Sequence, residues 1–167
     1  MKALAHLALA VSLASACSSQ PTVADSGAVA APDPAVAAQF ARYRQLSAEP
    51  TPSSWHADAI WDFVIYDSGG KIENEVSFKV TADPAATCLG GDWRKLVVLR
   101  ETSPMTSDPA YLLEGRNLLV LLSTDLCDGY DELKGELSAA SFSGQHISSG
   151  LFGGTDHGKV TGKAATP

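Results

Sequence analysis

The sequence predicts an all-β fold: a small antiparallel meander barrel, or a sandwich, of about eight strands with one N-terminal amphipathic helix. Three observations lead to this prediction. Apolar and polar residues alternate in short segments between residues 55 and 163, glycine-rich turns separate these segments, and consecutive hairpins explain nearly every connection. The β-barrel domain is therefore expected to span residues 55–163.

The clearest hairpin is DAIWDFVIYDSGGKIENEVSFKVTAD, where hydrophobicity repeats every second residue. Trp61, Phe63 and Ile65 share one face of the first strand. A Ser-Gly-Gly turn follows, and apolar residues at every second position from 76 to 80 form the matching face of the return strand. This pattern indicates two strands with one buried side.

Shorter segments supply the remaining strands. WRKLVVLRE forms one, and Trp93 at its start is expected to pack into the barrel; AYLLEGRNLLVLLST breaks into a second hairpin at residues 114–117. DELKGELSAASFSGQHISSG gives two strands with bends at Gly135 and Gly144, and HGKVTGKA gives the last. Glycine bends are how small barrels curve and close, which favours a barrel of lipocalin-like shape over a sandwich.

A helix is expected at residues 34–49, ahead of the strands. Asp33 followed by Pro34 is an N-cap with proline in the first helical position. Val36, Phe40 and Tyr43 then recur at helical spacing, so this stripe is expected to dock on the barrel.

The first sixteen residues predict an export signal. Met1 and Lys2 give a positive start, and ALAHLALAVSLASA is an apolar run shorter than the roughly 20 residues that span a bilayer. The run ends in small residues directly before Cys17. Cleavage by the general signal peptidase after Ala16 is one outcome that this pattern allows.

The segment LASAC at residues 13–17 also resembles the lipobox of bacterial lipoproteins, although Ala14 stands where that motif usually has leucine. The resemblance implies that Cys17 is lipidated and becomes the new N-terminus. Because Ser18 rather than aspartate follows, comparison with lipoprotein sorting implies attachment to the outer membrane, facing the periplasm or the surface. Residues 17–33 have few bulky apolar side chains, so they are expected to form a flexible tether.

The three cysteines fit this assignment. If Cys17 carries lipid, Cys88 and Cys127 can pair in the oxidising cell envelope. Their disulfide would close a loop of about 40 residues, for which the chain-entropy model gives at most about 4 kcal/mol. Two buried free thiols are the alternative.

The net charge of −7 disfavours nucleic acid as a partner. No nucleophile elbow, phosphate loop or zinc-binding helix occurs in the sequence, so no catalytic residue, metal or cofactor is assigned. His146 and His157 flank the turn SSGLFGG and could face each other across a hairpin, where Asp156 could join them in metal binding or acid–base chemistry. Surface histidines beside a loop are the alternative.

Two further patterns are candidates for chemistry. A serine could act with His146 as a nucleophile, the choices being Ser141, Ser143, Ser148 and Ser149. Asp125, Asp128 and Asp131 could bind calcium, but their spacing differs from an EF-hand loop and also suits a solvated loop beside the disulfide.

Two classes of function follow. The favoured one is a tethered binding module that engages a periplasmic protein, as inhibitors and immunity proteins do, or a small apolar ligand. The alternative is a small hydrolase or metal-dependent enzyme that uses His146 and His157. Binding is favoured because no group of residues has the specificity that a catalytic assignment needs.

Overall fold

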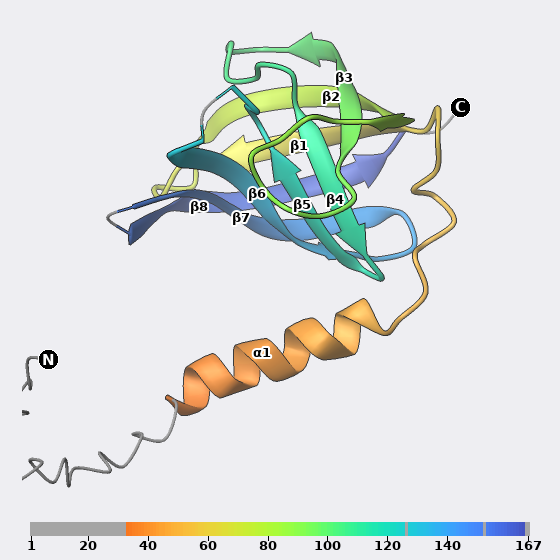
Figure 1. Cartoon of the computed structure of the whole chain (residues 1–167). Helices are drawn as coiled ribbons and strands as arrows, with labels where there is room; N and C mark the ends of the chain where they lie inside the picture. The colour runs from red at the N-terminus through yellow and green to blue at the C-terminus, as the bar shows by residue number, and fades with distance from the viewer. Residues whose placement is uncertain (1–32, 126, 152, 166–167) are drawn as a thin grey trace, which may run out of the picture. The chain divides into compact units, whose positions relative to one another are not determined.

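The computed structural model describes residues 33–125, 127–151 and 153–165 (Figure 1). The predicted signal segment, Cys17 and the tether up to residue 32 lie outside these residues. Within them, the chain forms one helix and eight strands, as the sequence predicts. The elements are α1 (Pro34–Ser47), β1 (Ile60–Tyr66), β2 (Ile72–Pro84), β3 (Arg94–Glu101), β4 (Ala110–Glu114), β5 (Asn117–Leu121), β6 (Gly129–Leu137), β7 (Ser141–Gly150) and β8 (Gly153–Ala164).

The eight strands form a closed antiparallel barrel in sequence order, and β8 returns to pair with β1. Short hairpin connections keep consecutive strands adjacent, and closure pairs the two strands that would otherwise be the edges of the sheet. The prediction of a meander barrel of about eight strands is confirmed.

Aromatic side chains fill the barrel interior. Trp61, Phe63 and Ile65 of β1 are at most 1% exposed, which confirms the alternation read from the sequence. The ring of Phe63 packs against Phe78 and Phe142, with ring centroids 5.7 and 5.3 Å apart. An eight-stranded barrel is just wide enough for side chains to fill it, so these rings form its core.

A second, smaller apolar cluster lies on the outer side of the wall. Tyr111 and Val120 contribute to the inner core, so their neighbours Ala110 and Leu121 point outward, where Trp93 packs on them. The expectation that Trp93 enters the barrel is therefore wrong. Trp93 precedes β3 and belongs to the loop of residues 85–93, which folds back over the outer face of β4 and β5.

The disulfide predicted between Cys88 and Cys127 is present, with the two Cα atoms 5.4 Å apart. It joins the loop after β2 to the loop before β6. The disulfide therefore fastens the loop of residues 85–93 to the loop before β6.

The barrel wall is weakest between β3 and β4. These strands share only the pairs Arg94 with Tyr111 and Lys95 with Ala110, followed by one backbone hydrogen bond from Leu96 to Pro109. Beyond Leu96, β3 continues to Glu101 with β2 as its strand partner. One edge of β3 is therefore left without a neighbouring strand among the described residues.

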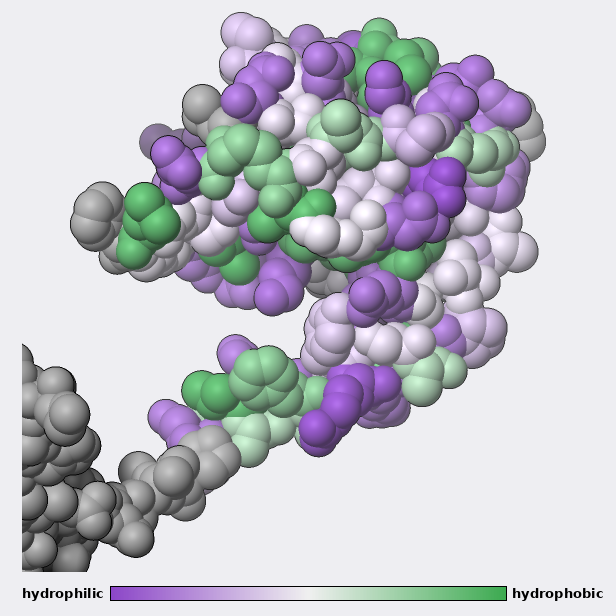
Figure 2. Space-filling model, viewed as in Figure 1, coloured by the Kyte–Doolittle hydropathy of each residue, from purple (hydrophilic) through white to green (hydrophobic). Residues whose placement is uncertain are grey.

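Helix α1 begins as predicted, because the Asp33 side chain accepts a hydrogen bond from the Ala35 amide at 2.8 Å. It contacts the barrel mainly through its last turn and the residues that follow. Leu46 is buried, whereas Val36 and Phe40 are 43% and 63% exposed, so the predicted docking of the whole stripe is wrong (Figure 2). Among the described residues, no helix is long and apolar enough to cross a bilayer.

Arg116 explains why contact is limited to this end of the helix. It lies in the turn between β4 and β5, and its guanidinium binds Glu49 at 2.7 Å and Glu136 of β6 at 2.6 Å. Its backbone amide donates to the Leu46 carbonyl. This junction fixes the end of α1 at the end of the barrel where β4 and β6 terminate.

Candidate functional site

Several polar side chains enter the barrel at the end opposite to α1. Residues two apart in a strand point to the same face of the sheet. Asp131 is two residues from buried Leu133 in β6, so its side chain points into the barrel. His146 and Ser148 are an even number of residues from buried Phe142 in β7, so they also point inward. These positions lie near the start of β6 and the end of β7, by the turn to β8. We call Glu73, Asp131, His146, Ser148 and His157 the mouth network.

His146 is the most deeply buried member, at 3% exposure. Its Nε2 lies 2.7 Å from Asp131 Oδ1. Its Nδ1 has no hydrogen-bond partner and faces Glu73 Oε2 at 3.7 Å. One imidazole is thus held between two carboxylates contributed by β6 and β2.

These contacts change the proton affinities of both partners. Burial alone would lower the pKa of His146, but the hydrogen bond and charge of Asp131, together with the charge of Glu73, raise it overall. The hydrogen bond from His146 lowers the pKa of Asp131 despite its partial burial. The geometry therefore favours a charged pair of imidazolium and carboxylate.

His157 completes the network from β8. Its ring centroid lies 4.8 Å from that of His146, so the two histidines face each other as the sequence suggested. Ser148 Oγ lies 2.6 Å from His157 Nε2 and also donates to Asp131 Oδ1 at 3.3 Å. When the serine hydroxyl donates to the carboxylate, His157 Nε2 donates to the serine, and one continuous chain links both histidines.

A β-bulge positions His157. The register pairs His146 with Gly158 and then Ile147 with Asp156, which leaves His157 as the extra residue. Gly158 has φ of 147° and approaches the backbone of Tyr66 and Asp67 so closely that a Cβ would clash. Glycine at this position therefore permits the bulge that turns His157 toward Ser148.

The other predicted ligands do not join the histidines. Asp156 accepts hydrogen bonds from Gln145 Nε2 and the Gly158 amide, and Asp125 accepts one from Ser107 Oγ. Asp128 is exposed. Within the part of the chain that the structure describes, no group of three or more histidine, cysteine or acidic residues is arranged to hold a metal ion.

All four candidate serines lie in β7: Ser141 contacts the Ser138 hydroxyl, and Ser143 is exposed. Ser148 contacts His157 rather than the expected His146, and Ser149 donates to Glu132 on the outer face. A serine hydroxyl within hydrogen-bond reach of an imidazole is the first requirement for nucleophilic catalysis. Asp131 contacts Ser148 and His146. No described carboxylate forms a hydrogen bond with the second ring nitrogen of His157, so the order serine, histidine, acid of a catalytic triad is not formed around His157.

Glu73 and Asn74 are the residues that sequence reasoning missed. Asn74 is fully buried: it accepts hydrogen bonds from the Thr102 and Ser103 amides and donates to Glu101 Oε1. A signal was available, because Asn74 occupies an inward position two residues before Val76 in the alternating pattern. Glu73 gave no such signal, because a β-bulge places it. Ile65 pairs with Asn74 and Tyr66 pairs with Ile72, so Glu73 is the extra residue between them. The bulge turns its carboxylate toward His146.

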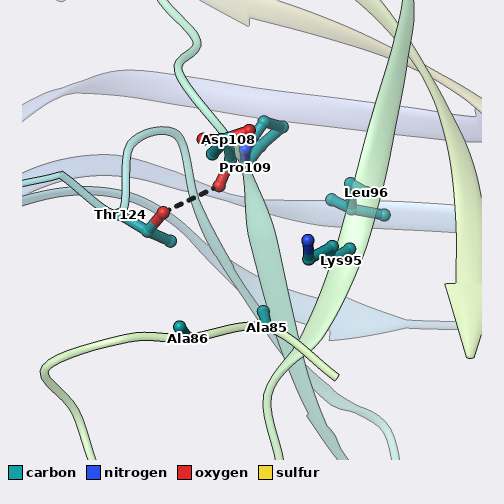
Figure 3. A pocket seen from close by; sticks show the side chains of 7 residues that line it. All are labelled: Ala85, Ala86, Lys95, Leu96, Asp108, Pro109 and Thr124. Atoms are coloured by element: carbon teal, nitrogen blue, oxygen red, sulfur yellow. Dashed lines mark hydrogen bonds between the residues drawn. The ribbon is translucent and has the colours of Figure 1, made fainter. Parts of the chain in front are cut away.

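Two hollows lie outside the mouth network. A small cavity of about 110 Å³ lies between Lys95 and Leu96 of β3 and the segment before β4, with Thr124 and Ala85 among its other lining residues (Figure 3). A shallow groove of about 390 Å³ runs beside the turn after β1 and is lined by Tyr66, Asp67 and Lys159. Neither is lined by His146, Ser148 or His157.

Comparisons with protein-family models, curated proteins and solved structures find no match to this chain. Its class is therefore defined by the structure alone. It is a small, closed, antiparallel eight-stranded barrel with a filled interior and a disulfide-fastened outer loop.

Proposed function

We propose that the protein is an exported, lipid-anchored binding module that engages another protein of the cell envelope. The observation that carries this proposal is the filled interior, where Trp61, Phe63 and Phe142 occupy the space that a ligand would need. A barrel of this kind offers partners its outer surface and rim. The same packing gives less support to the alternative of a small apolar ligand inside the barrel.

The mouth network supports binding rather than catalysis. Its members are satisfied largely by one another: Asp131 receives hydrogen bonds from His146 and Ser148, and Ser148 also contacts His157. Neither hollow opens on these side chains. Because these hydrogen bonds occupy Asp131, the Ser148 hydroxyl and His157 Nε2, the network is better suited to holding the mouth together than to catalysis.

Anchoring rests on the sequence around Cys17. Wild-type protein exported by its own signal should incorporate labelled fatty acid and fractionate with membranes, and Cys17→Ser should lose the label. Label retained by Cys17→Ser would contradict lipidation at this residue. An unlabelled wild-type protein in the soluble periplasm would instead indicate cleavage by the general signal peptidase.

Binding is tested with the soluble form, residues 18–167, immobilised and exposed to periplasmic and envelope extract. One protein should be retained saturably and displaced by free soluble form. The His146→Ala, His157→Ala double variant should retain it equally well once its folding is verified by circular dichroism. Failure to retain any protein saturably would contradict the proposal.

A second candidate, a small hydrolase, is favoured by one observation: the 2.6 Å contact between Ser148 Oγ and His157 Nε2. A serine positioned this way could attack an ester if His157 accepted its proton. Turnover in a panel of ester substrates that Ser148→Ala abolishes, with Ser149→Ala as the matched control, would place this candidate first. Equal turnover in both variants, or none in the wild type, would dismiss it.

A further inference from the structure

The edge of β3 that faces β4 differs from the rest of the wall. Pairing with β4 ends at Lys95, and the hydrogen bond from the Leu96 amide to the Pro109 carbonyl is the last backbone contact between the two segments. The stretch Val97–Glu101 then keeps β2 on one side and has no strand on the other within the described chain. Open strand edges are templates for another extended chain.

The loop that follows β3 is held elsewhere and does not restore the ladder. Glu101 accepts hydrogen bonds from the Met105 amide and the Thr106 hydroxyl, and Asn74 binds the amides of Thr102 and Ser103. Met105 packs against the inner core. Ser107 bridges to Ser123, and its amide donates to the Leu122 carbonyl. Among the described residues, no backbone hydrogen bond joins this loop to Val97–Glu101.

The cavity of about 110 Å³ lies where the two strands separate. Lys95 and Leu96 form one side, and Asp108 and Pro109 form the other (Figure 3). Thr124 donates to the Asp108 carbonyl and holds that second side in place. The cavity therefore lies at the point where the unpaired edge of β3 begins.

The exposed side chains on this edge are apolar and basic. Val97 and Leu99 are 46% and 49% exposed, so two large apolar side chains lie in contact with solvent on this strand. Lys95 and Arg100 form no ion pair with the described residues. The neighbouring cations do have acidic partners: Lys79 binds Asp58 at 2.8 Å and Arg94 binds Asp92 at 2.7 Å.

We infer that Val97–Glu101 receives an extended, acidic segment of the partner protein as an additional strand beside β3. The inference rests on the proposed binding function and names the chemistry of its partner. Opposite-charge and apolar pairs across adjacent strands stabilise a sheet, so the segment carries acidic residues near Lys95 and Arg100 and an apolar residue near Val97. Unpaired cations on a chain of net charge −7 are the groups that would attract it.

Asp108 restricts how the segment lies. Its carboxylate borders the cavity on the side away from β3, so an acidic side chain placed there would be repelled. The acidic residues of the segment therefore point outward beside β3, on the face that carries Val97 and Leu99. The partner backbone supplies the hydrogen bonds, and the outward side chains supply the selectivity.

The test uses the soluble form, residues 18–167, and a short blocked peptide that alternates threonine with glutamate or valine. Binding is measured by fluorescence anisotropy, and its location by NMR shifts of the β3 amides. We expect shifts centred on Val97–Glu101, affinity that falls as salt is added, and no binding of the same peptide with lysine in place of glutamate. Shifts centred elsewhere, or equal binding of both peptides, would overturn the inference.

Backbone methylation separates strand addition from simple charge attraction. A peptide N-methylated at the alternate residues that face β3 should lose binding, whereas methylation of the other alternate set should be tolerated. Two methylated peptides that bind alike would show that no strand is added.

Charge reversal supplies the matched variants. Lys95→Glu with Arg100→Glu should weaken peptide binding by about tenfold or more, whereas Lys159→Glu with Lys163→Glu on β8, an equal change of charge at exposed positions, should leave it within about twofold. Equal effects would point to net charge and overturn the assignment to this edge.

Extract capture distinguishes failure of this inference from failure of the proposed function. If the Lys95→Glu, Arg100→Glu variant still retains the envelope protein, the binding function stands and the β3 edge is excluded. A second copy of the chain is the other possible occupant of this edge, and analytical ultracentrifugation of the wild type tests for it. Self-association that the Lys95→Glu, Arg100→Glu variant abolishes would assign the edge to a second copy and overturn the inference.

Discussion

At the scale of single residues, the mouth network shows how a polar group is accommodated inside a small barrel. Burial of an imidazole at 3% exposure is costly, and His146 offsets this cost by a hydrogen bond from one nitrogen to Asp131 and by the nearby charge of Glu73 on the side of its unpaired Nδ1. The carboxylates come from β6 and β2, which are not adjacent in the wall. The network therefore links strands across the mouth that the backbone ladder does not join.

Asp131→Asn should lower the free energy of unfolding by about 1 kcal/mol near pH 5.5, a value reduced for solvent screening because the Asp131 side chain is 38% exposed. Because the pKa of His146 is raised in the folded state, the contribution of the pair to the free energy of unfolding is complete below about pH 6.5 and is lost as pH rises through the folded pKa. The lowered pKa of Asp131 means that its contribution is complete above about pH 4 and is lost as pH falls.

Urea unfolding of the wild type and Asp131→Asn at several pH values measures this difference. It should be largest between about pH 4 and 6.5 and shrink toward pH 8.5. A difference that grows above pH 6.5 would contradict the charged pair. Ser149→Ala, next to the network but bonded to Glu132 on the outer face, should show no such pH dependence.

Gly135 and Gly144, predicted as bends, lie directly opposite each other in the β6–β7 ladder. A Cβ at residue 135 would meet the Ser143 carbonyl and approach the Phe142 ring to 2.8 Å. Gly135→Ala should therefore destabilise the protein by about 2–3 kcal/mol in urea unfolding, because backbone and core must shift together. Gly90→Ala is the control, because its added methyl meets nothing within 4 Å, and it should change stability by less than about 0.5 kcal/mol. Similar effects of the two substitutions would contradict the interpretation that close packing requires glycine at residue 135.

At the scale of elements, the loop of residues 85–93 acts as a cover for one side of the barrel. Outward-facing Ala110 and Leu121 would expose apolar surface if the loop were absent, and Trp93 and Leu89 bury it. The disulfide between Cys88 and Cys127 fixes the cover to the loop before β6. A buried aromatic and a covalent bond thus secure a segment that has no ladder of its own.

The Cys88→Ser, Cys127→Ser double variant should fold but lose about 2–4 kcal/mol of stability, since the disulfide no longer restrains the unfolded chain. Thermal unfolding by circular dichroism measures the change, and reduced wild type should match the variant. Trp93 fluorescence should then become more quenchable by acrylamide, because the cover loosens. Wild type that unfolds at the same temperature with and without reductant would contradict a stabilising role.

At the scale of the whole molecule, closure is the feature on which the fold depends. Pairing of β1 with β8 gives each of these strands a second neighbour, and residues from across the wall, such as Trp61, Leu133 and Val160, share one core. Helix α1 adds a single buried side chain, Leu46, and a few polar contacts toward its C-terminal end. The barrel and the helix therefore contribute very differently to stability.

A chain that ends at Gly150 and lacks β8 should fail to fold, because β1 and β7 lose a neighbour and the core is opened. A chain that begins at Thr51 and lacks α1 should keep the barrel spectrum and a cooperative transition at somewhat lower temperature. Near-ultraviolet circular dichroism of the core tryptophans distinguishes the two outcomes. A folded chain without β8, or an unfolded one without α1, would show that closure is not the determining feature.

Features that depend on local pattern could be predicted from the sequence without coordinates. Period-two alternation around Trp61 and Phe78 identified buried faces, Asp33 with Pro34 placed the start of α1, and turn residues divided the strands. The cysteine count predicted the disulfide. Each of these follows from rules that act over a few residues or from the number of reactive groups available, so no coordinates were needed.

Features that depend on strand register and on side-chain direction became visible only in the folded chain. A bulge turned His157 toward Ser148, another brought Glu73 to His146, and the early departure of β4 from β3 opened an edge at Val97–Glu101. Trp93 took the outer face because the loop that carries it folds back over β4 and β5. A single residue of register shift reverses the direction of every side chain beyond it, and a linear pattern does not record where such shifts occur.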